Sequence, residues 1–290
     1  MTRFITTIIL AFAVLRGIYS LSADGFKIFV LIAGILGLWE YARLAFSPTP
    51  TGGLQPPTGG LQAPAGGLQA PAGGWERRYT EIAGAVLLYL FLWHSNTSWP
   101  LLALAFFLFG GALLVMKRSD PISQAMDRLG LMTLGWIYLP LMLSFWGKLR
   151  DLQQGWVMVL LCLVSACLTD TFGFLFGKTV GKRLFAPILS PKKTWEGFFG
   201  AFIGSFLGAL IVCALWLPQW SYYHFVAIGL LMGFVAPMGD LAESLLKRSR
   251  GVKDSSQMIP GHGGILDRLD ALIFAAPVVY GYLIWVVGVS

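Results

Sequence analysis

The residues that could do chemistry gather in one polar stretch near the C-terminus, residues 239–270. It contains two carboxylate pairs at i,i+3 spacing, Asp240 with Glu243 and Asp267 with Asp270. If both segments are helical, each pair lies on one helix face. Carboxylate oxygens are the ligands that Mg²⁺ prefers, and protein-bound Mg²⁺ usually keeps positions open for substrate phosphates. The spacing therefore predicts a cation site that handles phosphate groups, with simple salt bridges as the alternative.

Cationic and hydrogen-bonding residues lie between the two carboxylate pairs. Lys247 follows Glu243 by four residues and continues the same predicted helix face. A Lys253-Asp254 step comes next, and then a Pro-Gly-His-Gly-Gly segment whose glycines allow a ligand to approach the backbone closely. His262, in that segment, could orient a phosphate or transfer a proton. These residue types favour binding of a phosphorylated substrate.

A second basic segment lies upstream, in the loop 177–197. Its Ser-Pro-Lys-Lys-Thr sequence precedes a predicted helix start, where backbone N–H groups and the helix dipole attract phosphate oxygens. The loop also begins Gly-Lys-Thr-Val-Gly-Lys, but the spacing of a P-loop is absent. Lys178, Lys182 and Arg183 are interpreted as charges that set membrane topology. The predicted phosphate contacts in this loop are Ser190, Lys192, Lys193 and Thr194.

Three acidic residues fall within or beside apolar runs. Asp170 lies inside such a run, where a carboxylate is expected to face a polar cavity or a partner. Glu40 and Glu81 are predicted to pair with a nearby arginine, such as Arg43 or Arg78, and not to take part in catalysis.

The elements that must position these residues are membrane helices. Of the 290 residues, 56% are hydrophobic and only 12% are charged, whereas a soluble chain carries about 25% charge. The net charge of +7 is interpreted as the positive-inside bias of a membrane protein, and no nucleic-acid partner is expected. Three cysteines in apolar runs, without a Cys-x-x-Cys motif, indicate neither a disulfide framework nor a zinc site.

The apolar runs predict an all-α polytopic protein with about nine spans, because a span needs about 20 mostly apolar residues. Basic residues concentrate in alternate loops, which places the N-terminus in the cytoplasm and the C-terminus outside. The repeat at 51–74, rich in Gly, Pro and Gln, predicts a flexible cytoplasmic linker. We divide the chain into N-terminal helices, 1–150, and a catalytic part, 151–290. The predicted spans are 4–21, 26–46, 79–93, 99–116, 130–147, 156–176, 198–217, 222–241 and 265–288.

At these polar residues the sequence resembles the phosphatidate cytidylyltransferase family, also called CDP-diacylglycerol synthases. The family signature begins Ser-x-x-Lys-Arg, continues with a Lys-Asp step, and ends with His-Gly-Gly and Asp-Arg-x-Asp. The resemblance is dense from about residue 168 to the C-terminus, and the repeat at 51–74 looks like an insertion. The matching residues are Ser244, Lys247, Arg248, Lys253, Asp254, His262, Gly263, Gly264, Asp267, Arg268 and Asp270.

The resemblance implies that CTP and phosphatidic acid react to give CDP-diacylglycerol and pyrophosphate, with Mg²⁺ required. The site would lie at the cytoplasmic face of a cell inner membrane. Whether a second cation binds, and whether the protein forms a homodimer, are left open. Metal binding is assigned to Asp240, Asp267 and Asp270, supported by Asp170. Catalytic roles are assigned to Asp254, His262, Lys247 and Arg268. Substrate binding is assigned to Ser190, Lys192, Lys193, Thr194, Arg248, Lys253, Gly263 and Gly264.

Two other classes of function remain as alternatives. The first is a CTP-dependent membrane enzyme that uses a polyprenol, phytol or an archaeal lipid as acceptor, since the sequence does not show the lipid groove. The second is an ion-coupled transporter with acids inside the membrane, which inverted repeats would favour. A purely structural scaffold would leave the carboxylate pairs without a purpose.

Overall fold

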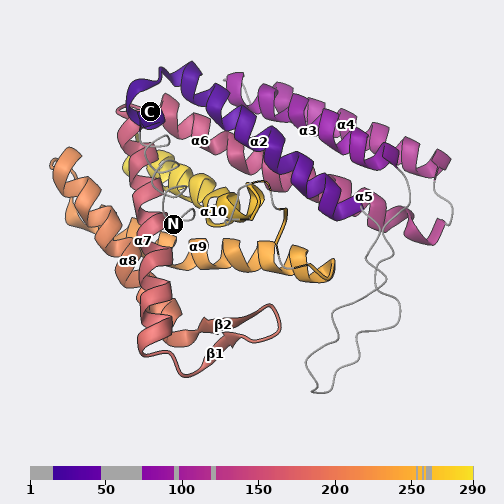
Figure 1. Cartoon of the computed structure of the whole chain (residues 1–290). Helices are drawn as coiled ribbons and strands as arrows, with labels where there is room; N and C mark the ends of the chain where they lie inside the picture. The colour runs from indigo at the N-terminus through magenta and orange to yellow at the C-terminus, as the bar shows by residue number, and fades with distance from the viewer. Residues whose placement is uncertain are drawn as a thin grey trace. The chain divides into compact units, whose positions relative to one another are not determined.

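The computed structural model describes residues 16–46, 74–94, 98–118, 122–252, 254–256, 258 and 263–289. Nearly all of them are helical, with one short β-hairpin, so the predicted all-α class is confirmed (Figure 1). The helices are α2 (Ala23–Phe46), α3 (Gly74–Trp93), α4 (Ser98–Arg118), α5 (Ala125–Trp136), α6 (Met142–Asp151), α7 (Gly155–Thr179), α8 (Trp195–Trp216), α9 (Tyr222–Ser249) and α10 (Leu266–Tyr282). Shorter elements are η1 (Ile122–Gln124), η2 (Ile137–Leu141), η3 (Leu283–Val287), β1 (Leu184–Ala186) and β2 (Ser190–Thr194).

Among the described residues, seven helical segments are long and apolar enough to cross a membrane. They are α2, α4, the continuous segment Ile122–Asp151, α7, α8, α9 and the segment Leu266–Val287, and each coincides with a predicted span. The predicted span 79–93 is helical as α3 but is not one of the seven. Most of the predicted span 4–21, and the repeat at 51–74 except Gly74, lie outside the described residues. The total of about nine spans therefore stays a prediction.

The chain groups into two compact units, which we describe separately. The first unit comprises Met1–Val30, Met142–Leu245 and Asp267–Ser290. The second comprises Leu31–Leu141 and Leu246–Leu266. Each unit therefore joins segments that are far apart in the sequence.

In the first unit, α7 and α8 pack with their backbones in close contact along a row of glycines. A Cβ atom added at Gly200 would lie 2.6 Å from the Cβ of Phe176, and one at Gly208 would lie 2.7 Å from the Cα of Ser165. At Gly204 an added Cβ would collide with the carbonyl oxygen of Leu168. Small residues at such spacing let membrane helices approach closely. This contact fixes α7 against α8. It thereby also fixes the two ends of the β1–β2 hairpin, which joins these helices.

We expect Gly204→Val to destabilise the first unit, because the valine side chain would force α7 and α8 apart. Overpacking of this kind costs about 1–3 kcal/mol. Thermal unfolding of the purified protein in detergent measures the loss. Gly130→Ala is the matched control, since a Cβ there meets nothing within 4 Å. Equal unfolding temperatures for Gly204→Val and the wild type would show that the two helices do not pack in this way.

The second unit has a core built around Trp136, which is fully buried. The Trp136 ring nitrogen donates a hydrogen bond of 3.1 Å to the carbonyl oxygen of Thr80. A buried salt bridge of 3.1 Å joins Arg128 to Glu76 in the first turn of α3. Taking one partner away from such a pair leaves an uncompensated buried charge, so loss of either residue is expected to destabilise the packing of α5 on α3.

Candidate active site

The predicted phosphate-binding segment forms strand β2, which pairs antiparallel with β1 and leads directly into α8. The predicted helix start is confirmed, because Thr194 is the N-cap residue and its hydroxyl oxygen accepts a 3.2 Å hydrogen bond from the Gly197 N–H. The carboxylate of Glu196 accepts hydrogen bonds from the N–H groups of Lys182 and Arg183, at 3.0 and 3.3 Å. These contacts hold the hairpin against the first turn of α8.

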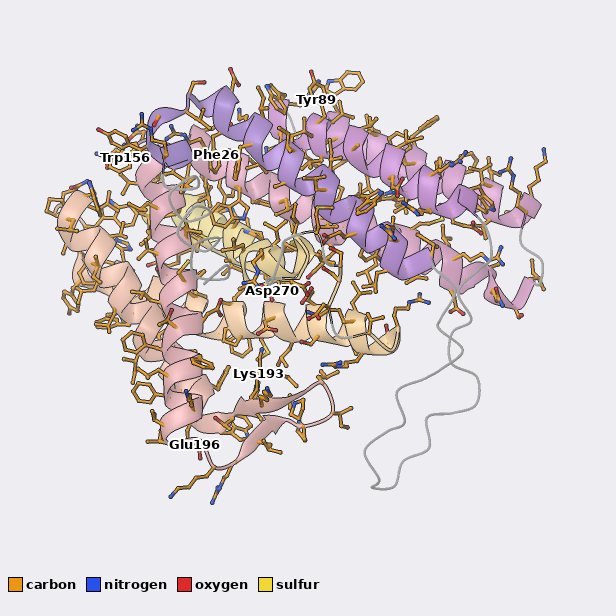
Figure 2. The ribbon with its side chains drawn as sticks, viewed as in Figure 1. Phe26, Tyr89, Trp156, Lys193, Glu196 and Asp270 are labelled. Carbon is orange, nitrogen blue, oxygen red and sulfur yellow. The ribbon has the colours of Figure 1, made fainter. Side chains whose placement is uncertain are left out.

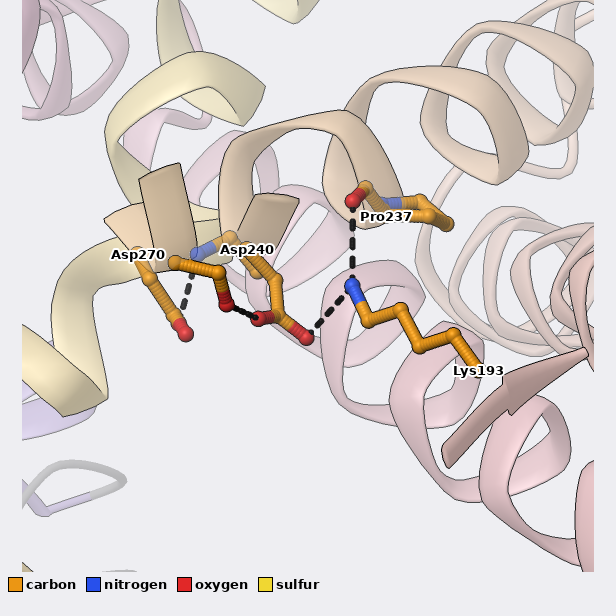
Figure 3. Close-up of polar contacts among 6 residues, drawn as sticks. Lys193, Pro237, Asp240 and Asp270 are labelled. Carbon is orange, nitrogen blue, oxygen red and sulfur yellow. Dashed lines mark hydrogen bonds and ion pairs between the residues drawn. The ribbon is translucent and has the colours of Figure 1, made fainter. Parts of the chain in front are cut away.

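Lys193 connects this hairpin to α9 within the first unit (Figure 2). Its ammonium nitrogen lies 2.8 Å from the Oδ2 atom of Asp240 and donates a 3.3 Å hydrogen bond to the carbonyl oxygen of Pro237 (Figure 3). The side chains of Lys193 and Asp240 are 23% and 35% exposed. Both charges therefore stay accessible to a ligand while they neutralise one another.

Asp240 lies where α9 meets α10. A Cβ atom added at the preceding residue, Gly239, would lie only 2.6 Å from the carbonyl oxygen of Asp270, so the two backbones touch there. Ser244, one turn further along α9, donates a 3.4 Å hydrogen bond to the Oδ1 atom of Asp240. The carboxylate of Asp270 accepts a 2.7 Å hydrogen bond from the N–H of Ala271. Asp240 and Asp270 thus belong to separate helices whose backbones touch at this crossing (Figure 3).

Asp170 adds a third carboxylate from α7. It is exposed, and it interacts electrostatically with Asp240, Lys193 and Arg268. Arg268 belongs to the first turn of α10, next to the half-buried Asp267. The structure therefore brings acidic and basic side chains from α7, β2, α9 and α10 into one cluster. We call it the charged cluster, and its members are Asp170, Lys193, Asp240, Asp267, Arg268 and Asp270.

The oxygen donors of the charged cluster fit a hard divalent cation in their chemistry, since all four acidic members are carboxylates on neighbouring elements. In the structure, however, these carboxylates are not arranged to coordinate one ion together. Within the described part of the chain, no three His, Cys, Asp or Glu side chains are grouped closely enough to hold an ion. One carboxylate, that of Asp240, is instead neutralised by Lys193. Binding of a cation would therefore need these side chains to turn toward one another.

The remaining predicted site residues belong to the second unit, in the last turn of α9 and in the connection between α9 and α10. Arg248 donates a 3.3 Å hydrogen bond to the carbonyl oxygen of Val252, and Asp254 is exposed. Gly263 has a φ angle of 79°, a backbone conformation that glycine adopts readily. Lys247 is half-buried in the last turn of α9, and Gly264 is buried. Two predicted residues, Lys253 and His262, lie outside the described residues.

Of three further polar residues, Glu243 and Glu40 differ from their predictions, whereas Glu81 pairs with a nearby arginine as expected. Glu243 is fully buried, so it does not share the accessible position of Asp240 despite the i,i+3 spacing. Glu81 does pair with an arginine, but the partner is Arg77, at 2.8 Å. The prediction for Glu40 is wrong, because its carboxylate accepts hydrogen bonds from the α9–α10 connection and not from an arginine.

Arg43, the arginine predicted to pair with Glu40, lies over the ring of Trp39, 4.6 Å from its centroid. Nearby in the second unit, Arg250 is almost completely buried. Burial lowers the pKa of its guanidinium, and the nearby carboxylate of Asp127 opposes that shift. The α9–α10 connection thus contains buried charge as well as exposed polar groups.

These features define an integral membrane protein in which polar residues of both charge signs meet where α7, β2, α9 and α10 come together. Comparison with known proteins gives the family. The model of the Cytidylyltransferase family matches residues 1–286. A phosphatidate cytidylyltransferase of Pseudomonas aeruginosa is 32% identical over 292 residues, which cover 99% of this chain and 97% of that protein.

Two shorter matches extend the comparison. Phosphatidate cytidylyltransferase 4 of Arabidopsis thaliana chloroplasts is 37% identical over 71% of this chain and 57% of that protein. The Bacillus subtilis phosphatidate cytidylyltransferase is 38% identical over 53% of this chain and 58% of its own length. The alignments with these two relatives thus span little more than half of their length. The chain belongs to the Cytidylyltransferase family and is a nucleotidyltransferase.

Proposed function

We propose that the protein transfers the cytidylyl group of CTP to phosphatidic acid, giving CDP-diacylglycerol and pyrophosphate. The observation that carries the proposal is the charged cluster, in which Lys193 and Asp240 meet beside Asp170 and the first turn of α10. Family membership supplies the cytidylyl chemistry. The names of the relatives supply the lipid acceptor.

The reaction is a displacement at phosphorus. An oxygen of the phosphatidic acid phosphate forms a bond to the α-phosphorus of CTP, and the bond from that phosphorus to the α,β-bridging oxygen breaks. Pyrophosphate leaves with the electron pair. The attacking phosphate is already ionised near neutral pH, so no general base has to remove a proton from it.

The chain's own residues would bind and orient two anionic substrates. Lys193 and Arg268 are the cationic members of the charged cluster, and Lys192 is exposed on the same strand as Lys193. Charge-assisted hydrogen bonds from such groups hold phosphate oxygens and stabilise negative charge that builds on the leaving group. The family resemblance also assigns phosphate contacts to Lys247, Arg248 and Lys253.

Mg²⁺ is part of the proposal, with Asp170, Asp240, Asp267 and Asp270 as the residues that would hold it. A bound divalent cation supplies charge neutralisation on the triphosphate and on the departing pyrophosphate. We further propose that the charged cluster faces the cytoplasm and that the protein resides in the inner membrane of a bacterial cell. The distribution of basic loop residues supports this orientation, and the bacterial relatives support the membrane.

The test is pyrophosphate release by the full chain purified in detergent, with CTP and phosphatidic acid supplied together or singly. We expect release only when both substrates and Mg²⁺ are present, and we expect chelation with EDTA to stop it. A panel with polyprenol and phytol tests the acceptor. Release with one of these alcohols but not with phosphatidic acid would overturn the proposed acceptor. Release from CTP without any lipid would overturn transfer itself.

A further inference from the structure

Glu40 is a fully buried acidic residue in the last two turns of α2, and it is not used in the reaction described above. Among the described residues, its carboxylate accepts hydrogen bonds from two serines of the α9–α10 connection and from two N–H groups at the start of α10, all in the same unit. One oxygen, Oε1, accepts from the Ser256 hydroxyl at 2.6 Å and from the Ile265 N–H at 3.1 Å. The other, Oε2, accepts from the Ser255 hydroxyl at 3.1 Å and from the Leu266 N–H at 2.8 Å.

The two N–H donors lie at the start of α10, which begins at Leu266. The first N–H groups of a helix have no partner within the helix, and the helix dipole favours negative charge there. Glu40 therefore acts as an N-terminal cap that comes from a segment about 225 residues earlier in the chain. Glu40 also accepts hydrogen bonds from the hydroxyls of Ser255 and Ser256, which lie about ten residues before the start of α10.

Gly264 shows how closely the connection closes around this carboxylate. A Cβ atom added at Gly264 would collide with the Oε2 atom of Glu40 and with the hydroxyl of Ser255. Glycine is therefore required at this position because the carboxylate occupies the space of a side chain. The same glycine is one of the predicted substrate-binding residues, so the carboxylate touches the segment that carries the predicted site.

We propose that Glu40 is a positioning residue for cytidylyl transfer. It fixes the serine pair and the segment at Gly264 in the α9–α10 connection, and it fixes the first residue of α10. Asp267 and Arg268 follow that residue directly in the chain, so the start of α10 determines where they lie. The catalytic part of this inference rests on the proposed function, whereas the fixing of the connection does not.

Glutamine cannot replace Glu40, although it has the same shape. In either orientation its NH₂ group would face one hydroxyl and one backbone N–H. The hydroxyl can rotate and accept a hydrogen bond, but the backbone N–H can only donate. One buried N–H at the start of α10 would then lose its partner, and unsatisfied buried donors are costly. Alanine at Ser256 removes one hydroxyl donor and serves as a milder second variant.

The experiment compares Glu40→Gln and Ser256→Ala with the wild type in detergent, using two readouts. The first is limited trypsin digestion, in which mass spectrometry follows cleavage after the buried Arg250. The second is the kinetics of CTP use with phosphatidic acid. Glu81→Gln is the matched control, since Glu81 is also a helical glutamate of the second unit but pairs with Arg77 on its own helix.

We expect Glu40→Gln to be cleaved about tenfold faster in the connection, because local opening there costs less free energy. We also expect KM for CTP to rise about fivefold and kcat to fall about tenfold, since both phosphate contacts and the start of α10 are displaced. Ser256→Ala should change each quantity in the same direction but less. A variant that is only partly unfolded would lower kcat at an unchanged KM.

Several results would overturn the proposal. Cleavage of Glu40→Gln at the wild-type rate would show that the carboxylate does not fix the connection. Faster cleavage with unchanged kinetics would remove the positioning role, and so would equal kinetic losses in Glu81→Gln. If the wild type does not use CTP and phosphatidic acid while Glu40→Gln is still cleaved faster, the proposed function fails and the structural role of Glu40 stands.

Discussion

Asp240→Asn is expected to lower the rate of CDP-diacylglycerol formation about 100-fold or more, because it removes negative charge at the centre of the charged cluster. The asparagine would keep the shape of Asp240 but could neither neutralise Lys193 nor serve as a strong ligand for a cation. Stability should change little, since partly exposed salt bridges contribute about 0–1 kcal/mol. Initial rates and thermal unfolding in detergent measure the two effects separately.

Asp151→Asn is the matched control for this variant. Asp151 also pairs with a lysine of the first unit, Lys27, at 2.7 Å, and its side chain is 43% exposed. We expect the Asp151→Asn rate to stay within about twofold of the wild type, because this pair joins structural segments and is only partly buried. Similar activity in Asp240→Asn and the wild type would contradict the placement of Asp240 in the site.

Lys193→Met is expected to have the second largest effect, raising KM for CTP about tenfold and lowering kcat about tenfold, since it removes a cation that binds phosphate oxygens. Methionine retains most of the aliphatic volume, so the hairpin should stay in place through Thr194 and Glu196. Steady-state kinetics with varied CTP concentration separate the two parameters.

Two variants sharpen the interpretation of Lys193→Met. Lys182→Met removes an exposed lysine just before strand β1, and we expect wild-type kinetics because only the backbone of Lys182 makes a described contact. The double variant Lys193→Met with Asp240→Asn should lose less than the product of the two single losses, because the two residues act as one pair. If the loss in the double variant equals the product of the two single losses, Lys193 and Asp240 act independently.

The long apolar runs of the sequence predicted the helices, because membrane spans are determined by local composition. Seven predicted spans coincide with helical segments that could cross a membrane. The β1–β2 hairpin was not predicted, since its strands are three and five residues long and lack an alternating apolar pattern. The Ile122–Asp151 segment was predicted to be shorter, because its first residues are polar.

The charged cluster could be predicted in part because charged residues are rare in this chain. Asp240 and the first turn of α10 stand out by residue type and i,i+3 spacing, and the structure places them at one helix crossing. The pairing of Lys193 with Asp240 spans 47 residues and depends on how the hairpin folds back. Rules that rest on neighbouring residues in the sequence cannot predict a contact between residues so far apart in the chain.

Glu40 was misinterpreted for a related reason. A glutamate three residues before an arginine, at helical spacing, favours a local ion pair. The partners that it has in the structure are 215 to 226 residues away and include two backbone N–H groups. Backbone donors have no signature in the sequence, so only the folded structure reveals this contact.

The most direct test of cytidylyl transfer follows the label from CTP that carries ³²P at either the α- or the γ-phosphate. The purified protein is incubated with phosphatidic acid and Mg²⁺, and the lipid is extracted into organic solvent. We predict that the α-label enters the lipid fraction while the γ-label remains in water as pyrophosphate. Transfer of the γ-label to lipid, or no α-label in lipid from any acceptor, would contradict the account.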